Sequence, residues 1–297
     1  DDMFGKKSWE EAESHIQEMA VDKLLIKSGM AASDIDYIYA GDLLGQLIAT
    51  SFGLMRYEIP MFGLYGACST MGEALSLGAM CVNAGYAQNV IAIASSHFAS
   101  AEKQFRYPLE YGNQRPVAST WTVTGAGAYI VGDKPLDKKK CVLIKGITTG
   151  KIVDYGVKDS MNMGACMAPA ACDTIIQNLE DFERKETDYD RIIAGDLGYV
   201  GQSILFDLMR GKEHDIKINH MDCGMTIFDQ NLQDTHAGGS GCGCAAATLS
   251  AYILPKISRG EWKRVLFVPT GALMSTVSYN EGASVPGIAH GIVLEHC

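Results

Sequence analysis

The sequence predicts an α/β protein made of two similar tandem halves that stack as a layered α-β-α-β-α body. Short apolar runs rich in β-branched residues recur along the chain, and helix-like segments alternate with them. An internal repeat is also present. Alternating helices and apolar strands are typical of sheets that are covered by helices on both faces.

Three segments of the first half recur in the same order in the second half. The motif at 36–43 (DYIYAGDL) is matched at 190–197 (DRIIAGDL), the segment at 89–96 is matched at 264–271, and 126–131 is matched at 289–294. Because the order is kept, we expect a duplication with one half at 1–140 and the other at 141–297.

The repeat also places the individual elements. Strands are expected at 35–40, 90–94, 191–194 and 265–268, and amphipathic helices at 20–27 and 171–182. The stretch 74–101 carries no Asp, Glu, Lys or Arg, but polar residues and glycine interrupt its middle, where a bilayer would penalise them. We therefore predict a helix, a turn and a buried strand here, and no membrane span.

Composition and charge exclude several classes of protein. The 297 residues are 47% apolar and 20% charged, which excludes a disordered chain, and the formal net charge is −10. Such a surface repels nucleic acid, so an anionic ligand would need a local basic pocket. The nine cysteines are odd in number, and no secretion signal opens the sequence. We therefore expect free thiols in a reducing compartment.

Cys68 is the first candidate for chemistry. It lies between an apolar strand-like run and a helix of small residues, so we expect it at a helix N-terminus. There the helix dipole would lower the pKa of the thiol and attract anions. The alternative is a small buried hydrophobic side chain.

The second candidate is the polar and aromatic segment 95–116, which we expect to be a loop after a strand. Its residues could clamp carboxylates and stack on a planar ring, or they could form a solvated loop at a dimer interface. The candidate ligand-binding residues here, together with Cys68, are His97, Glu102, Lys103, Arg106, Tyr107 and Arg115.

The second half contributes Asp222 and His290 as further candidates for ligand binding. Several cysteines and histidines invite a metal hypothesis, but no Cys-x-x-Cys or His-x-x-His pair supports it, so no metal site is predicted. The glycine run at 238–243 lacks the Lys and Ser/Thr of a phosphate-binding loop.

Two tandem halves with a strand, a cysteine and a helix resemble the thiolase fold of condensing enzymes. A more specific resemblance, to the stage V sporulation protein AD family, covers essentially the whole chain. It is carried by segments 40–44, 62–70, 95–97, 104–112, 122–127, 167–171, 222–224, 237–244 and 288–291. Members of that family carry a further N-terminal segment with the first strand of the first half, which we expect to be missing from this sequence.

The resemblance implies a non-enzymatic protein that binds dipicolinic acid for its uptake into, or release from, the bacterial spore. Calcium dipicolinate is an alternative form of the ligand, and no cofactor is implied. The implied partners are membrane-embedded sister proteins, with the chain peripheral on the spore inner membrane. A pocket for this planar dicarboxylate needs donors for the carboxylates and an apolar slot for the ring.

The chain departs from active condensing enzymes at the second-half helix start. Their Gly-His-Pro element is replaced by residues 239–242 (GSGC). Cys68 without its partner groups should lose most of its catalytic power, so it is at most a vestigial nucleophile. The alternatives are a Cys-dependent acyltransferase with His97 or His290 as its base, and a structural scaffold for a membrane channel.

A homodimer is also expected, because thiolase-type halves pair edge strands across a two-fold axis. The uncharged strand at 90–94 is the expected edge.

Overall fold

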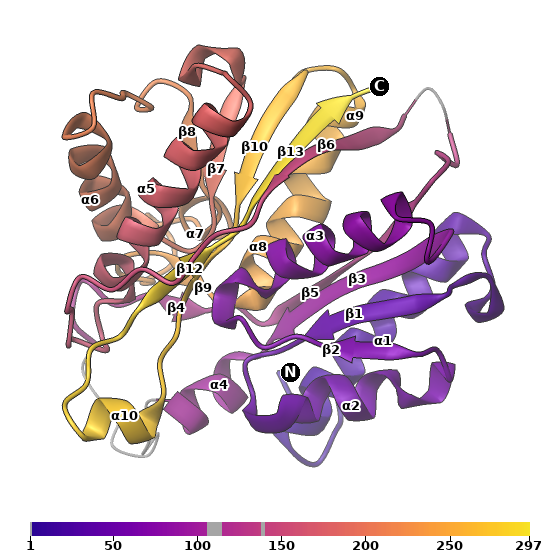
Figure 1. Ribbon diagram of the computed structural model, residues 1–297. Helices are drawn as coiled ribbons and strands as arrows, with labels where there is room; N and C mark the ends of the chain where they lie inside the picture. The colour runs from indigo at the N-terminus through magenta and orange to yellow at the C-terminus, as the bar shows by residue number, and fades with distance from the viewer. Residues whose placement is uncertain (1, 106–114, 138–139) are drawn as a thin grey trace.

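Two mixed sheets form the framework of the molecule (Figure 1). The computed structural model describes residues 2–105, 115–137 and 140–297. The first sheet has the order β2-β1-β3-β5, with strands at Tyr37–Gly41 (β1), Met61–Gly63 (β2), Asn89–Ser96 (β3) and Gly125–Gly132 (β5). The second has the order β6-β13-β10-β7-β8, with strands at Val142–Thr148 (β6), Arg191–Ala194 (β7), His220–Asp222 (β8), Arg264–Val268 (β10) and Gly291–His296 (β13).

Two short strand pairs and a set of helices complete the fold. β4 (Trp121–Thr122) pairs with β9 (Gly239–Ser240), and β11 (Thr270–Ala272) pairs with β12 (Gly287–Ala289). The first-half helices are α1 (Trp9–Ser28), α2 (Ile48–Leu54), α3 (Thr70–Asn83) and α4 (Phe98–Phe105). The second-half helices are α5 (Met163–Asp181), α6 (Gly198–Arg210), α7 (Cys223–Thr226), α8 (Cys242–Thr248), a π-helical turn (Leu249–Ile253), α9 (Leu254–Ser258) and α10 (Thr276–Asn280).

The two sheets repeat one topology. β1 and β3 are parallel and β5 is antiparallel to β3, just as β7 and β10 are parallel and β13 is antiparallel to β10. The second sheet also has β6, which pairs antiparallel with the outer side of β13. Within the described residues, β5 has no strand on the corresponding side. The predicted duplication and the predicted α/β fold class are therefore confirmed.

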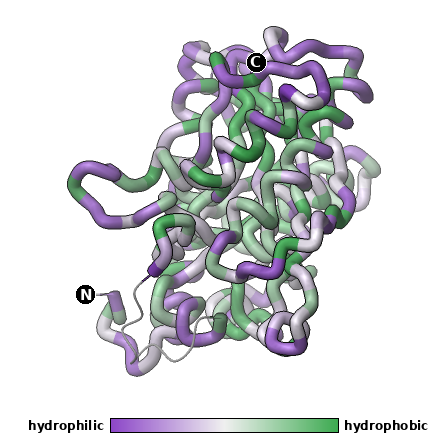
Figure 2. Tube along the Cα trace, turned by 90° about the vertical axis from the view of Figure 1, so that its left-hand side faces the viewer, coloured by the Kyte–Doolittle hydropathy of each residue, from purple (hydrophilic) through white to green (hydrophobic). Residues whose placement is uncertain are grey.

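The two sheets and the helices form the five predicted layers, and three hydrophobic cores lie between them. One core lies between the first sheet and α1 with α2, and another lies between the second sheet and α5 with α6. The third core joins the halves, because α3 and α8 lie between the two sheets and their side chains pack with those of β3, β10 and β13. In Figure 2 hydrophobic stretches run through the middle of the molecule and hydrophilic ones gather at its periphery.

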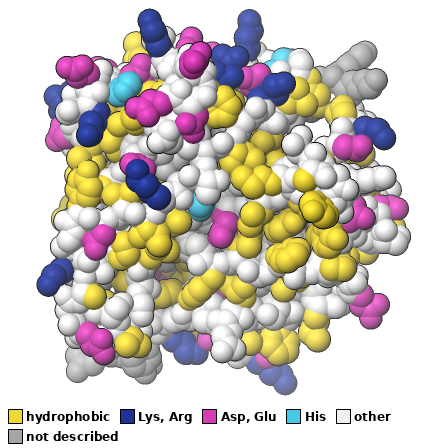
Figure 3. All heavy atoms as spheres, in the orientation of Figure 1, with side chains coloured by type: hydrophobic (Ala, Val, Ile, Leu, Met, Phe, Trp, Pro, Cys, Tyr) yellow, Lys and Arg dark blue, Asp and Glu magenta, His cyan; other side chains and the backbone are white. Residues whose placement is uncertain are grey.

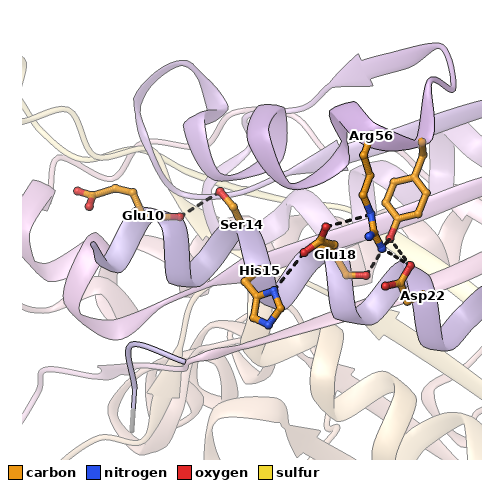
Figure 4. Close-up of polar contacts among 7 residues, drawn as sticks. Glu10, Ser14, His15, Glu18, Asp22 and Arg56 are labelled. Carbon is orange, nitrogen blue, oxygen red and sulfur yellow. Dashed lines mark hydrogen bonds and ion pairs between the residues drawn. The ribbon is translucent and has the colours of Figure 1, made fainter. Parts of the chain in front are cut away.

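α1 shows how local sequence sets a helix and fixes it in place. Its N-cap Ser8 accepts a hydrogen bond from the Glu11 amide, and Gly29 ends the helix with a φ of 69°. Arg56, which follows α2, bonds to Glu18 at 3.0 Å and to Asp22, and thereby ties α2 to the outer surface of α1 (Figure 4). The sequence predicted only 20–27 of this helix, because its first turns carry many charged residues.

Two predictions about the fold are wrong. The strand expected at 90–94 as a dimer edge is β3, which lies between β1 and β5 and has no free edge. Cys141 and Cys297 form a disulfide instead of remaining free. They directly precede β6 and directly follow β13, and His296 pairs with Val142 at that end of the ladder, so the fold brings their Cα atoms within 5.6 Å. The other seven cysteines are free.

Candidate functional site

Cys68 lies at the predicted junction of strand and helix. The chain leaves β2, forms a 3-10 turn at Ala67–Ser69 and continues into α3. Ala67 takes a left-handed φ of 52°, and its carbonyl accepts a hydrogen bond of 3.0 Å from the Cys242 thiol. Gly271 of β11 packs so closely that a Cβ there would lie 3.1 Å from the Cys68 nitrogen. A strand of the second half therefore covers the start of this helix.

The expected activation of the Cys68 thiol is wrong. Burial raises its pKa well above the usual range, and the neighbouring Asp196 adds to the rise. Cys68 lies in the core between the two halves, where a thiolate would lose its hydration. This loss outweighs the favourable effect of the helix dipole on the thiolate, which is weaker and acts only within the first turn. Cys68 is a neutral thiol at neutral pH.

Cys68 nevertheless lines a pocket of about 230 Å³ between the two halves. Leu43, Tyr65, Ala67, Cys68, Ala101, Glu102, Phe105 and Thr122 come from the first half, and Met163, Ser240, Gly241, Ala272, Leu273, Met274 and Ser275 come from the second. Most of these side chains are apolar. The volume suits a ligand built on one aromatic ring, held by a few polar groups.

The pocket carries a single charged side chain among its described lining residues. Glu102 is 5% exposed, accepts hydrogen bonds from Arg115 at 3.0 Å and Thr122 at 3.1 Å, and faces the cavity from α4. Arg115 also stacks over the ring of Trp121 at 4.6 Å. Ion pairing and stacking hold this guanidinium beside the pocket wall, where it donates a hydrogen bond to the Glu102 carboxylate.

Two other candidates of segment 95–116, His97 and Lys103, do not line the pocket. Residues 98–105 form α4 instead of the expected loop. Because successive helix residues are turned by about 100°, Lys103 points away from Glu102 and pairs with Glu10 at 2.9 Å. His97 is fully buried and its Nε2 lies 2.8 Å from the Asp2 carbonyl oxygen, outside the pocket. Arg106 and Tyr107 lie outside the described residues.

The second-half candidates have structural roles in the described chain. Asp222 caps α7 and also accepts hydrogen bonds from the amides of Leu197 and Gly198. His290 accepts a hydrogen bond of 3.3 Å from the Gly150 amide, and burial lowers its pKa. Neither side chain lines the pocket. Among the residues that the structure describes, no three His, Cys, Asp or Glu side chains are arranged to hold a metal ion.

Sequence reasoning missed two parts of the site. Met163 and the segment 272–275 form the second-half wall, and only the fold brings them to Cys68. Asp196 lies behind Cys68, fully buried. The repeat offered a signal for Asp196, because it stands at the same place in its motif as Asp42.

Comparison with known proteins identifies the family. The sequence profile of the family described as Stage V sporulation protein AD matches residues 1–295. The chain belongs to the stage V sporulation protein AD family. It is 41% identical to Stage V sporulation protein AD of Bacillus subtilis (strain 168) over 290 residues, which cover 98% of this chain and 84% of the relative.

Solved structures place the family's fold among the condensing enzymes. The chain resembles 3-oxoacyl-[acyl-carrier-protein] synthase III from Aquifex aeolicus VF5 with a TM-score of 0.59 and 13% identity, covering 98% of this chain and 85% of that one. It also resembles a thiolase from Ascaris suum solved with coenzyme A, with a TM-score of 0.60, 11% identity and coverage of 98% and 96%. These likenesses show the fold alone. This member of the sporulation family has no helix, within the described residues, that is long and apolar enough to cross a membrane.

Proposed function

We propose that this chain binds dipicolinic acid in the Cys68 pocket without chemical turnover, and serves its uptake into, or release from, the spore. The observation that carries the proposal is the pocket itself, a mostly apolar slot between the two halves with a few polar groups among its lining residues. Its size and lining match a planar aromatic ring with polar substituents. Membership of a sporulation family supports the biological setting.

The charge of the described lining favours calcium dipicolinate over the free dianion. Glu102 is the only charged residue there, and its ion pair with Arg115 leaves this part of the wall without a net positive charge for a dianion. A calcium ion held by dipicolinate neutralises the ligand and takes further oxygen ligands. The Glu102 carboxylate has enough lone pairs to contact the ion while it keeps Arg115 and Thr122.

The geometry does not favour the alternative of acyl transfer. Such chemistry needs a base within hydrogen-bond reach of the thiol. None of the described residues that line the pocket is a histidine, lysine or arginine. The histidines proposed as bases, His97 and His290, bond elsewhere.

Calorimetric titration of the purified chain with dipicolinate, with and without calcium, tests the proposal. We expect one ligand per chain and tighter binding when calcium is present. Glu102→Gln should abolish the calcium effect, whereas Glu261→Gln, at an exposed ion pair of the second half, should leave it unchanged. Heats indistinguishable from dilution with both forms of the ligand would exclude this function.

For partners we propose a homodimer and a position beside membrane-embedded sister proteins on the spore inner membrane. The dimer contact that we propose is the face around β2, the outer strand of the first sheet. Apolar side chains gather there over α3, β1 and β2 (Figure 3). They form a groove of about 400 Å³ lined by Tyr37, Tyr39, Phe62, Leu77, Met80, Cys81, Ala84 and Tyr86. The groove is uncharged, which suits contact between two chains of net charge −10.

A further inference from the structure

α1 turns two polar side chains toward the interior of the first half. Glu13 and Gln17 are four residues apart, so they project from the same side of the helix, and both are fully buried. The solvent side of this helix carries the ion pairs of Figure 4. A polar group is costly to bury unless it is hydrogen-bonded, so the partners of these two side chains indicate the role of this side of α1.

Gln17 connects α1 to the loop that follows β1. Its side-chain nitrogen donates a hydrogen bond of 2.9 Å to the Thr50 hydroxyl, and Thr50 donates one of 2.6 Å to the Asp42 carboxyl group. Asp42 also accepts a hydrogen bond of 2.7 Å from the Leu44 amide. Leu43, which stands between Asp42 and Leu44, lines the Cys68 pocket. This branch therefore ties α1 to the backbone on either side of a pocket residue.

Glu13 connects α1 to α4. Its carboxyl group accepts hydrogen bonds of 2.9 Å from the Ser95 hydroxyl and of 2.8 Å from the Ser100 hydroxyl. Ser95 also accepts a hydrogen bond of 2.8 Å from Gln17, so the two branches are joined. Ser100 is followed on α4 by two residues that line the pocket, the second of which is Glu102. One continuous set of buried hydrogen bonds therefore links two parts of the pocket wall through α1.

We propose that Glu13 and Gln17 are positioning residues, which hold α4 and the loop after β1 at the separation that the ligand needs. This inference rests on the proposed binding of dipicolinate. Neither side chain lines the pocket, so both act through the residues that they hold. A buried hydrogen-bond network specifies one arrangement of the elements that it joins, because a shifted partner leaves a polar group unpaired inside the protein.

The position of α4 matters because it carries Glu102. A carboxylate contacts calcium only when its oxygen lies about 2.3–2.6 Å from the ion, so even a small shift of α4 changes this contact. Lys103 and Glu10 also join α4 to α1, but an exposed ion pair contributes little. The loss of a group that orients a metal-contacting residue lowers the affinity for the metal by about 10- to 100-fold. We therefore expect the network to act on the binding of calcium dipicolinate.

Calorimetric titration of Ser100→Ala with calcium dipicolinate tests the proposal, because this variant removes one hydroxyl of the network and no pocket residue. We expect binding at least about tenfold weaker than in the parent. Amide hydrogen exchange of α4, measured without ligand, should become faster. Ser76→Ala is the matched control, because Ser76 is buried in α3 and its hydroxyl has no hydrogen-bond partner among the described residues. It should match the parent in both measurements.

Two variants of Glu13 separate positioning from a purely structural role. Glu13→Gln keeps the size of the side chain and can still bond to both serines, so it should bind like the parent. Glu13→Ala removes both bonds and should bind at least about tenfold more weakly while it remains folded by circular dichroism. A purely structural role would lower the free energy of unfolding in urea and leave the affinity of the folded variants unchanged.

The parent chain distinguishes the two ways in which the inference can fail. Heats of dilution alone in the parent would exclude the binding function and this inference with it. Binding in the parent with the same affinity in Ser100→Ala would overturn this inference alone. An affinity loss without faster exchange in α4, or an equal loss in Glu13→Gln and Glu13→Ala, would also overturn it, because the hydrogen bonds to α4 would then not be the cause.

Discussion

The carboxyl group of Glu13 accepts a hydrogen bond of 2.9 Å from the Ser95 hydroxyl, deep between α1 and the end of β3. Its second oxygen accepts one of 2.8 Å from Ser100 on α4. Glu13 is fully buried, and burial, with a smaller effect of Asp42, raises its pKa to about 8. α1, β3 and α4 therefore meet at an acid that stays protonated at neutral pH.

This acid makes stability depend on pH. The unfolded chain releases the Glu13 proton near pH 4.5, and the folded chain releases it near pH 8. Between these values the folded state binds more protons, so the free energy of unfolding falls as pH rises, by about 1.4 kcal/mol per unit. The contribution is complete below pH 4.5 and is lost above about pH 8.

Urea unfolding at several pH values between 6.5 and 8 measures this contribution. Other buried groups also change protonation between the two states: the pKa of His220 is lowered to about 3, that of Asp222 is raised to about 6, and those of Asp42 and Asp196 are raised. They are present in both the parent and Glu13→Gln, so the difference between the two slopes reports on Glu13. We expect Glu13→Gln to flatten the slope and Glu10→Gln, on the exposed side of the same helix, to keep it. Equal slopes in the parent and Glu13→Gln would contradict the assignment.

The sequence predicted much of the fold because burial and repetition leave local signals. The strands predicted at 191–194 and 265–268 coincide with β7 and β10 to within one residue, since a strand covered on both faces is an uninterrupted apolar run. The junction at Cys68 followed from the change from strand-like to helix-like residues. These features depend only on neighbours in the chain.

The site was less predictable because its decisive contacts are non-local. Asp222 lies 26 positions after Asp196 and accepts the amide hydrogen bonds of Leu197 and Gly198, whereas neither carboxyl oxygen of Asp196 has a hydrogen-bond partner among the described residues. Glu102 and Lys103 are neighbours in sequence but face different directions once α4 forms, so one lines the pocket and the other pairs with Glu10. Local composition predicts neither outcome.

Cys68 should not take an acyl group from a coenzyme A thioester. The thiol is neutral and no basic side chain of the described residues lines its pocket, so attack on the thioester carbonyl is slow. After incubation with acetyl-coenzyme A at pH 7.5, intact-mass spectrometry should show the unmodified chain. An acetyl adduct mapped to Cys68, and missing in Cys68→Ser, would support the acyltransferase alternative.

A charge placed in the apolar groove should separate the proposed dimer. Phe62 is 54% exposed on β2 and stacks on Tyr39 with ring centres 5.3 Å apart. Phe62→Asp would set two carboxylates against each other near a two-fold axis, which we expect to weaken self-association at least tenfold, or by about 1.4 kcal/mol. Sedimentation velocity at micromolar concentration measures it. Ile218→Asp, at a 91% exposed site of the second half, should sediment like the parent, and a monomeric parent would rule out the dimer.

Arg106 is the cation that we expect to anchor a carboxylate of dipicolinate. It lies outside the described residues, but its chain neighbour Phe105 lines the pocket. The loss of one charge-assisted hydrogen bond costs about 1.5–3 kcal/mol, so Arg106→Ala should weaken binding at least about tenfold in calorimetry.

Arg259 supplies the matched control for this prediction. Its guanidinium is 59% exposed after α9 and pairs only with a surface carboxylate, that of Glu261, in the described chain. A surface ion pair contributes little, so Arg259→Ala should bind dipicolinate like the parent and remain folded by circular dichroism. If Arg106→Ala also binds like the parent while folded, no carboxylate of the ligand depends on Arg106. The affinity would then have to come from Glu102 through calcium, and removal of calcium with a chelator should abolish binding in both variants alike.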